Sequence, residues 1–260
     1  MHLDAPCDLH TLYRRTEDYF FALLCLLHRR FSADTCAYFT AQKSSPFNVM
    51  FIRVGSHTPD DAMEAALDLM RHTSLEIRAV LHEQKVAALY EVLTSLGFHA
   101  AETTTAMVLR LSDFVSLPSE RAEQVGLTRD LNEWIVPVGN AFSLAPEVAA
   151  HYQARHQQAL DTEQALYHFS LSTEGQIRCS LTLSMCEGEA RLSDVATLAD
   201  VRGKGYGTRL IQAALLHAAS LGAQRCFLEA TASGISVYRK LGFKPLYNCQ
   251  AFVRGPILPA

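Results

Sequence analysis

Three glycines at alternate positions are the most informative chemical feature of the sequence. Gly203, Gly205 and Gly207 join an expected strand to a helix expected at residues 208–221. Glycine adopts backbone conformations with positive φ and lets a ligand approach the main chain closely. Free N–H groups at the start of a helix face an anion together with the positive end of the helix dipole. The spacing therefore predicts a phosphate or diphosphate site, with an ordinary glycine-rich turn as the alternative.

Two other nucleotide-binding patterns do not fit this segment. The dinucleotide fingerprint places G-x-G-x-x-G early in a βαβ unit, with an acidic residue about twenty positions later. Here the spacing is G-x-G-x-G, and it follows a meander that looks antiparallel. The phosphate loop G-x-x-x-x-G-K-[ST] does not occur in the sequence.

With its flanks, the glycine segment resembles the GNAT superfamily of N-acetyltransferases. Residues 202–207 read R-G-K-G-Y-G and match the signature R/Q-x-x-G-x-G/A. Residues 194–205 look like a variant of the strand and loop of that family, and residues 227–243 look like its closing strand and Y-x-x-L-G-F helix. The clear resemblance covers residues 131–252. Residues 1–111 resemble only loosely a degenerate GNAT half, as in tandem GNAT proteins.

The resemblance implies acyl transfer from acetyl-CoA, bound as a cosubstrate, to an amine. Residues 195–197 would pair with the pantetheine arm like an added strand, and the glycine segment would hold the pyrophosphate. Arg202 would anchor the loop or approach a phosphate, or it is a solvated surface charge. The expected coenzyme-binding residues are Val195, Ala196, Thr197, Arg202, Gly203, Lys204, Gly205, Tyr206, Gly207 and Thr208.

The transfer needs an acid for the leaving thiolate and a base for the attacking amine. In the family the acid is the tyrosine four residues before Gly-Phe, which is Tyr238 here. Glu229 is one candidate base, because some relatives carry a catalytic Glu in the matching segment, although the stretch between Glu229 and Tyr238 is shorter here. Asp194, directly before residues 195–197, is the second candidate, and a water chain is the third.

The first half of the chain does not carry the same chemistry. Residues 93–98 echo residues 238–243, but the position that matches Tyr238 is Leu93, which cannot donate a proton. Residues 55–61 hold one glycine, a proline and two acids, which would repel a pyrophosphate. We therefore expect one active site, in the C-terminal half. The alternative to an enzyme is a non-catalytic CoA-binding or protein-interaction module on the same fold.

The pattern of elements predicts an α+β protein made of two GNAT-like halves, with a mixed, mainly antiparallel sheet flanked by helices. The expected division is a degenerate half at 1–111, a linker at 112–126 and a catalytic domain at 127–260. The expected helices are 8–31, 59–70, 86–96, 131–142, 146–160, 208–221 and 236–241. The expected strands are 37–40, 49–54, 77–81, 107–111, 167–171, 177–185, 190–197, 226–230 and 251–253.

Composition excludes several classes of protein. The 260 residues are 49% hydrophobic and 19% charged with a net charge of −4, which argues against disorder, collagen and a protein that coats nucleic acid. The longest apolar candidate, residues 19–27, is shorter than the roughly 20 residues that a membrane helix needs. Residues 1–4 carry no basic run typical of a signal peptide. The expected partner is an amine-bearing small molecule or peptide.

The seven cysteines are odd in number and form no C-x-x-C motif, so reduced thiols in a cytoplasmic protein are expected. Cys25 and His28 lie one turn apart in the helix expected at 8–31 and could begin a metal site. No second pair stands at ligand spacing, so core packing is the favoured interpretation. The sequence predicts no metal and leaves the oligomeric state and the acceptor open.

Overall fold

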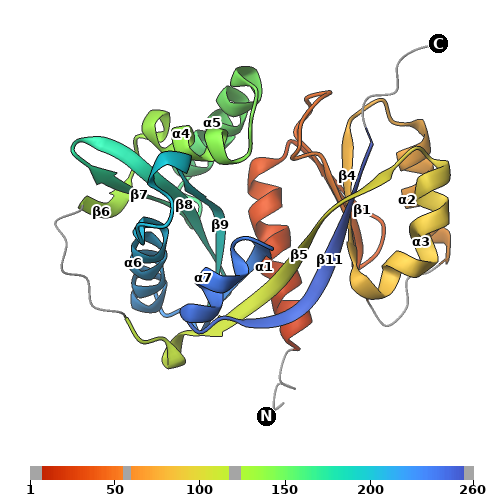
Figure 1. The fold of residues 1–260 in the computed structure, drawn as a ribbon. Coiled ribbons are helices and arrows are strands. Elements are labelled where there is room, and N and C mark those ends of the chain that lie inside the picture. The colour runs from red at the N-terminus through yellow and green to blue at the C-terminus, as the bar shows by residue number, and fades with distance from the viewer. Residues whose placement is uncertain (1–7, 55–59, 117–123, 255–260) are drawn as a thin grey trace. The chain divides into compact units, whose positions relative to one another are not determined.

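The computed structural model describes residues 8–54, 60–116 and 124–254, which form two compact units (Figure 1). Unit 1 holds the described residues of 1–24, 107–230 and 234–246, and unit 2 holds those of 25–106, 231–233 and 247–260. The first helix of the chain therefore belongs to the same unit as the glycine segment. Two long strands, β5 (His99–Arg110) and β11 (Lys244–Arg254), contribute residues to both units.

The sheet of unit 1 has the strand order β5-β10-β9-β8-β7-β6. Strands β6 to β9 pair with their neighbours in antiparallel fashion, whereas β9 and β10 are parallel. The other strands are β6 (Gln124–Thr128), β7 (Leu166–Thr173), β8 (Gln176–Cys186), β9 (Glu189–Thr197) and β10 (Arg225–Thr231).

Helices cover both faces of this sheet. Figure 1 shows α4 and α5 on the side of β8 and β9 opposite to α6. The α-helices are α1 (Leu9–Leu24), α4 (Leu131–Ala141), α5 (Pro146–Asp161), α6 (Tyr206–Ser220) and α7 (Ile235–Lys240). Short 3₁₀ turns lie at η1 (Leu111–Asp113) and η2 (Ala199–Val201).

The core under α6 follows from two periodicities. Alternate residues of β8, such as Leu181 and Leu183, point to one face of the sheet. On α6, Leu210, Ala214 and Ala218 recur at helical spacing and pack against them. All five side chains are buried, and burial of this apolar surface holds the glycine segment at one end of a rigid layer.

Unit 2 has the strand order β1-β2-β3-β4-β11-β5. From β1 to β11 in this order, neighbouring strands are antiparallel apart from β3 and β4, which are parallel. The remaining strands are β1 (Leu27–Arg30), β2 (Thr35–Phe39), β3 (Val49–Ile52) and β4 (Ile77–His82), and the helices are α2 (Asp60–His72) and α3 (Glu83–Ser95). A second apolar core includes Met50, Met70 and Phe252.

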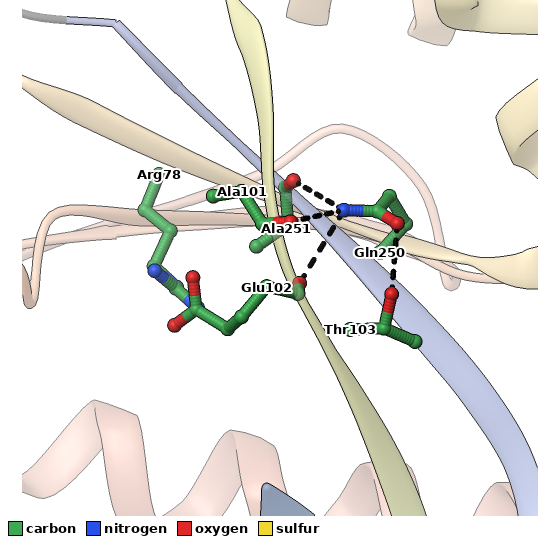
Figure 2. Close-up of polar contacts among 6 residues, drawn as sticks. All are labelled: Arg78, Ala101, Glu102, Thr103, Gln250 and Ala251. Atoms are coloured by element: carbon green, nitrogen blue, oxygen red, sulfur yellow. Dashed lines mark hydrogen bonds and ion pairs between the residues drawn. The ribbon is translucent and has the colours of Figure 1, made fainter. Parts of the chain in front are cut away.

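Polar side chains join the long strands in unit 2 (Figure 2). The amide of Gln250 on β11 donates to the carbonyl oxygens of Ala101 (2.9 Å) and Glu102 (3.4 Å) on β5. Its oxygen accepts a hydrogen bond from the Thr103 hydroxyl at 2.9 Å. The Glu102 carboxylate pairs with Arg78 of β4. Side chains thus connect three strands in addition to the backbone ladder.

The mixed, mainly antiparallel α+β fold is confirmed. The helix expected at 8–31 is wrong beyond residue 24, because Leu27–Arg30 pairs with β2 as a strand. Cys25 and His28 therefore do not share a helix. Residues 117–123 of the predicted linker, together with residues 1–4 and 55–59, lie outside the described residues, and the domain boundaries at 111 and 127 stay a prediction.

In the described part of the chain, no helix has the length and hydropathy needed to cross a bilayer. Within the same residues, no group of three or more His, Cys, Asp or Glu side chains could hold a metal ion.

Gly242 provides a test of the packing between β5 and the end of α7. Its φ is +95°, and an added Cβ would lie 3.2 Å from Leu109 Cδ1. Gly242→Ala should lower the free energy of unfolding by about 1–2 kcal/mol, because an L side chain is strained at this φ. Urea titration measures the change. Gly126→Ala is the control, since a Cβ there meets nothing within 4 Å, and equal losses in the two variants would contradict the analysis.

Candidate functional site

Strands β9 and β10 separate part of the way along their length. Their parallel pairing runs from Glu189 and Arg225 to Arg191 and Phe227 and stops there, although both strands are described to their ends. Beyond this point, residues 192–197 of β9 and residues 228–231 of β10 are not paired with each other. Backbone groups released in this way are available to a ligand that lies between the strands like an added strand.

The glycine segment follows directly from the diverging part of β9. Gly203 and Gly205 have φ values of +76° and +82°, and a Cβ on either would meet nothing within 4 Å. The backbone amides of residues 203–208 donate to no other group among the described residues. These amides surround the N-terminus of α6, where the helix dipole favours an anion. The diphosphate site that the sequence predicts at this loop stays a prediction.

Short contacts attach the loop to the end of β9. The Arg202 Nε donates to the carbonyl oxygen of Thr197 at 3.1 Å, so this guanidinium anchors the loop. A Cβ on Gly207 would lie 3.2 Å from Thr197 Oγ1, which explains why glycine fits there. Arg209 was not predicted from the sequence. Its guanidinium lies 5.0 Å from the Tyr206 ring centroid and donates to the Lys204 carbonyl at 3.4 Å, which adds positive charge beside the loop.

Asp194 lies on β9 and is buried. Its Oδ1 accepts a hydrogen bond from the Tyr152 hydroxyl, and its Oδ2 accepts one from the Thr182 hydroxyl, both at 2.8 Å. Burial raises the pKa of the Asp194 carboxyl to about 6, against the opposing effects of these two hydrogen bonds and the charge of Arg191. Asp194 therefore exchanges its proton near neutral pH, but each of its oxygens already accepts a hydrogen bond from a neighbouring side chain.

Glu229 lies on β10 beyond the last pair with β9 and is half-buried. It stands two residues after Phe227 and so shares its face of the sheet. Arg191, the partner of Phe227, is buried, and its Nη2 lies 3.5 Å from Glu17 Oε1 and 3.4 Å from the Tyr13 hydroxyl. Burial lowers the pKa of Arg191, but Tyr13, Glu17 and Glu229 together raise it above its ordinary value. A fixed positive charge therefore lies among these acidic groups.

Tyr238 lies on α7, and its ring contacts Phe243 edge-on with centroids 5.8 Å apart. Only 8% of its surface is exposed. Burial, with a smaller contribution from Cys226, raises the pKa of the Tyr238 hydroxyl well above its ordinary value. The phenol therefore keeps its proton at neutral pH, as a proton donor must.

Two buried histidines extend the environment of Asp194. His156 Nε2 lies 3.8 Å from Asp194 Oδ2, and His156 Nδ1 shares a hydrogen bond of 2.7 Å with His168 Nε2. The indole of Trp134 packs against both imidazoles, with centroids within 5 Å. Burial lowers the pKa of His168 to about 3 and that of His156 well below its ordinary value, so both rings are neutral near pH 7.

The structure thus places the predicted residues on neighbouring elements: Asp194 and residues 195–197 on β9, Glu229 on β10, Tyr238 on α7 and the anion loop before α6. Sequence reasoning missed the residues that hold them. Tyr152, Thr182 and Arg191 carry no local motif, because their partners lie far away in the sequence.

Unit 2 shows no comparable opening in its described residues. Strands β3 and β4 pair from Val49 and Arg78 to Ile52 and Leu81, so all of β3 is paired. Residues 55–59, where the sequence predicted a segment that repels pyrophosphate, lie outside the described residues.

Comparisons with known proteins agree with this geometry. The profile of the Acetyltransferase (GNAT) family matches residues 130–243. An uncharacterized N-acetyltransferase of Bacillus subtilis, YobR, is 35% identical over 68 residues, which is 25% of this chain and 28% of that protein. A GCN5-related N-acetyltransferase from Kribbella flavida has a similar fold at 14% identity, with a TM-score of 0.66 over 93% of this chain and 95% of that chain. A tandem GNAT protein from the clavulanic acid biosynthesis pathway is 15% identical, with a TM-score of 0.56 over 87% and 80% of the two chains.

The buried histidines give the protein a predictable response to acid. The unfolded chain binds protons at ordinary histidines near pH 6.5, whereas folded His168 binds one only near pH 3. The free energy of unfolding should therefore fall as the pH drops below 6.5, by up to about 1.4 kcal/mol per pH unit for each buried imidazole. Asp194 opposes this trend, since its raised pKa costs the folded state stability above about pH 6, and this cost is relieved as the pH falls from 6 to 3.8.

His168→Gln should reduce the slope of stability against pH between 6.5 and 4, as measured by urea unfolding at several pH values. The control is His99→Gln, which changes an exposed histidine of β5 and should leave the slope as it is in the parent. The account would be wrong if His168→Gln kept the parent's slope.

Proposed function

Because residues 130–243 match the profile of the Acetyltransferase (GNAT) family, we propose that the chain is an enzyme that transfers the acetyl group of acetyl-CoA to an amine. The observation that carries this proposal is the separation of β9 from β10 directly before a loop lined with free amides. The opening between β9 and β10 suits an extended ligand with amide groups, and the loop suits a diphosphate on the same ligand.

Acetyl-CoA has both of these parts. Its pantetheine arm would pair with the backbone of residues 195–197, and its pyrophosphate would accept hydrogen bonds from the amides of residues 203–208. Arg202 would act as an anchor through Thr197, and Arg209 would supply positive charge beside the phosphates. The coenzyme is a cosubstrate that arrives and leaves with each turnover.

We assign the general base to Glu229 and the general acid to Tyr238. Glu229 would take a proton from the ammonium form of the acceptor, and the resulting amine would attack the thioester carbonyl carbon. The carbon–sulfur bond then breaks, and Tyr238 would give its proton to the leaving thiolate. The attacking nitrogen would lose its second proton, which restores the Tyr238 hydroxyl, and Glu229 would release the first proton to solvent. The products are an acetylated amine and free CoA, with no acyl-enzyme intermediate.

Glu229 suits the base better than Asp194 does. It is half-buried, whereas Asp194 is buried and already accepts hydrogen bonds on both oxygens. Arg191 interacts electrostatically with both Glu17 and Glu229, so these three charges sum to one negative charge, which suits a cationic acceptor. The acceptor is therefore proposed as an amine-bearing small molecule or peptide.

Replacement of the acid separates chemistry from binding. Tyr238→Phe removes only the hydroxyl and keeps the packing against Phe243. With acetyl-CoA and a panel of polyamines, amino sugars and short peptides, kcat should fall by about 10²-fold or more. The affinity for acetyl-CoA, measured by calorimetry, should stay within about threefold of the parent's. Mass spectrometry of the acetylated product measures turnover.

Tyr167→Phe on β7 is the matched control, because this tyrosine lies two strands away from β9. It should leave both kcat and affinity unchanged. An unaltered kcat in Tyr238→Phe would remove Tyr238 from the mechanism. Binding of acetyl-CoA without turnover of any amine would favour the non-catalytic module, and no binding at all would overturn the proposed function.

A further inference from the structure

The separation of β9 from β10 coincides with an irregularity on the other edge of β9. Thr182 of β8 faces Ser193, but Ser180 faces Ala196, so Asp194 and Val195 together face a single residue, Leu181. This is a β-bulge, which bends the strand and increases its twist. Asp194 has a φ of +55°, a left-handed conformation that only a few non-glycine residues adopt readily, Asp among them.

The bulge changes which way the side chains of β9 point. Leu192 and Val195 both pack against the core under α6, although they are three residues apart. An uninterrupted strand would place them on opposite faces. Residues 195–197 therefore present a different set of backbone groups to β10 than a regular strand would. The bulge begins within three residues of the last pair between β9 and β10, at Arg191 and Phe227.

Three side chains from three elements hold the bulge. Tyr152 of α5 and Thr182 of β8 donate to the two oxygens of Asp194, each at 2.8 Å. The indole Nε1 of Trp134, from α4, donates at 3.1 Å to the carbonyl oxygen of Leu181, the residue opposite the bulge. All of these side chains are less than a tenth exposed. Hydrogen bonds made in such a buried place are costly to break, because water does not replace them.

The histidines close the remaining side of this cluster. His156 lies 3.8 Å from Asp194 Oδ2 and contacts Trp134, Tyr152 and His168. If His168 donates to His156 Nδ1, then His156 carries its proton on Nε2, facing the carboxylate. The carboxylate thus accepts one hydrogen bond on each oxygen, and its side chain is only 5% exposed, so a substrate amine has little access to it.

We infer that Asp194 is a positioning residue rather than the base: Tyr152 and Thr182 fix its carboxylate, and this fixes the bulge that keeps residues 195–197 open to the thioester arm of acetyl-CoA. This inference rests on the proposed function. Tyr152 and Thr182 are positioning residues of the same site, although neither contacts the coenzyme in this account.

Substitutions at Asp194 distinguish the two roles. Asp194→Asn keeps the tolerance for positive φ and one accepting oxygen, so the dissociation constant for CoA should rise less than in Asp194→Ala. Its kcat should fall by much less than the loss of about 10²-fold or more that removal of a base would cause. Asp194→Ala loses both hydrogen bonds and the tolerance for positive φ. The dissociation constant for CoA should therefore rise about tenfold or more, as measured by calorimetry. The folded fraction of each variant is measured first by circular dichroism.

A double-mutant cycle then tests whether the residues act as one unit. Tyr152→Phe and Thr182→Val should each weaken CoA binding in the parent, yet add little in the Asp194→Ala background. Thr105→Val, which removes a buried hydroxyl in unit 2, is the control and should leave the dissociation constant unchanged.

The outcomes separate the two proposals. If the parent binds CoA and Asp194→Ala binds it equally well, the positioning role is wrong and the proposed function stands. A 10²-fold loss of kcat in Asp194→Asn with unchanged CoA affinity would make Asp194 the base and would also overturn the inference. If the parent binds no CoA, the proposed function itself fails.

Discussion

The proposed coenzyme site depends on one constraint, which is that the pairing of β9 with β10 ends at Arg191 and Phe227. All the residues assigned to the coenzyme follow Arg191 in the sequence. The bulge at Asp194 turns the strand just beyond it, and buried donors from α4, α5 and β8 hold the bulge. A polar cluster of this kind costs free energy in a core unless its members satisfy each other. Here it stabilises an opening in the sheet.

The second part of the site is electrostatic and involves little side-chain chemistry. Gly203 and Gly205 have positive φ and lie directly before the start of α6. Because a diphosphate is large and doubly charged, many weak donors in a fixed array suit it better than one lysine. Arg202 contributes indirectly, since its guanidinium holds the loop to Thr197. The loop and the strand opening are therefore joined by short contacts and form one rigid surface within unit 1.

Local signals in the sequence predicted part of this arrangement. The glycine spacing, Tyr238 and Glu229 could be recognised because each belongs to a short contiguous motif. The partners of Asp194 could not, since Tyr152 lies 42 residues away and bonds through tertiary packing. The same limit explains the error at residues 25–31, whose apolar content suits a helix, although Leu27–Arg30 pairs with β2. That α1 belongs to unit 1, through contacts such as the one between Glu17 and Arg191, is also a tertiary fact.

The most direct test is a titration with CoA followed by the backbone amide resonances of the protein. The account predicts that the largest shifts occur at residues 195–197 and 203–208, with small shifts at β3 and β4, whose pairing leaves no opening. It also predicts that pantetheine, which lacks the diphosphate, shifts the amide resonances of residues 195–197 but not those of the glycine loop. Shifts confined to other residues, or no shift at millimolar CoA, would contradict the account.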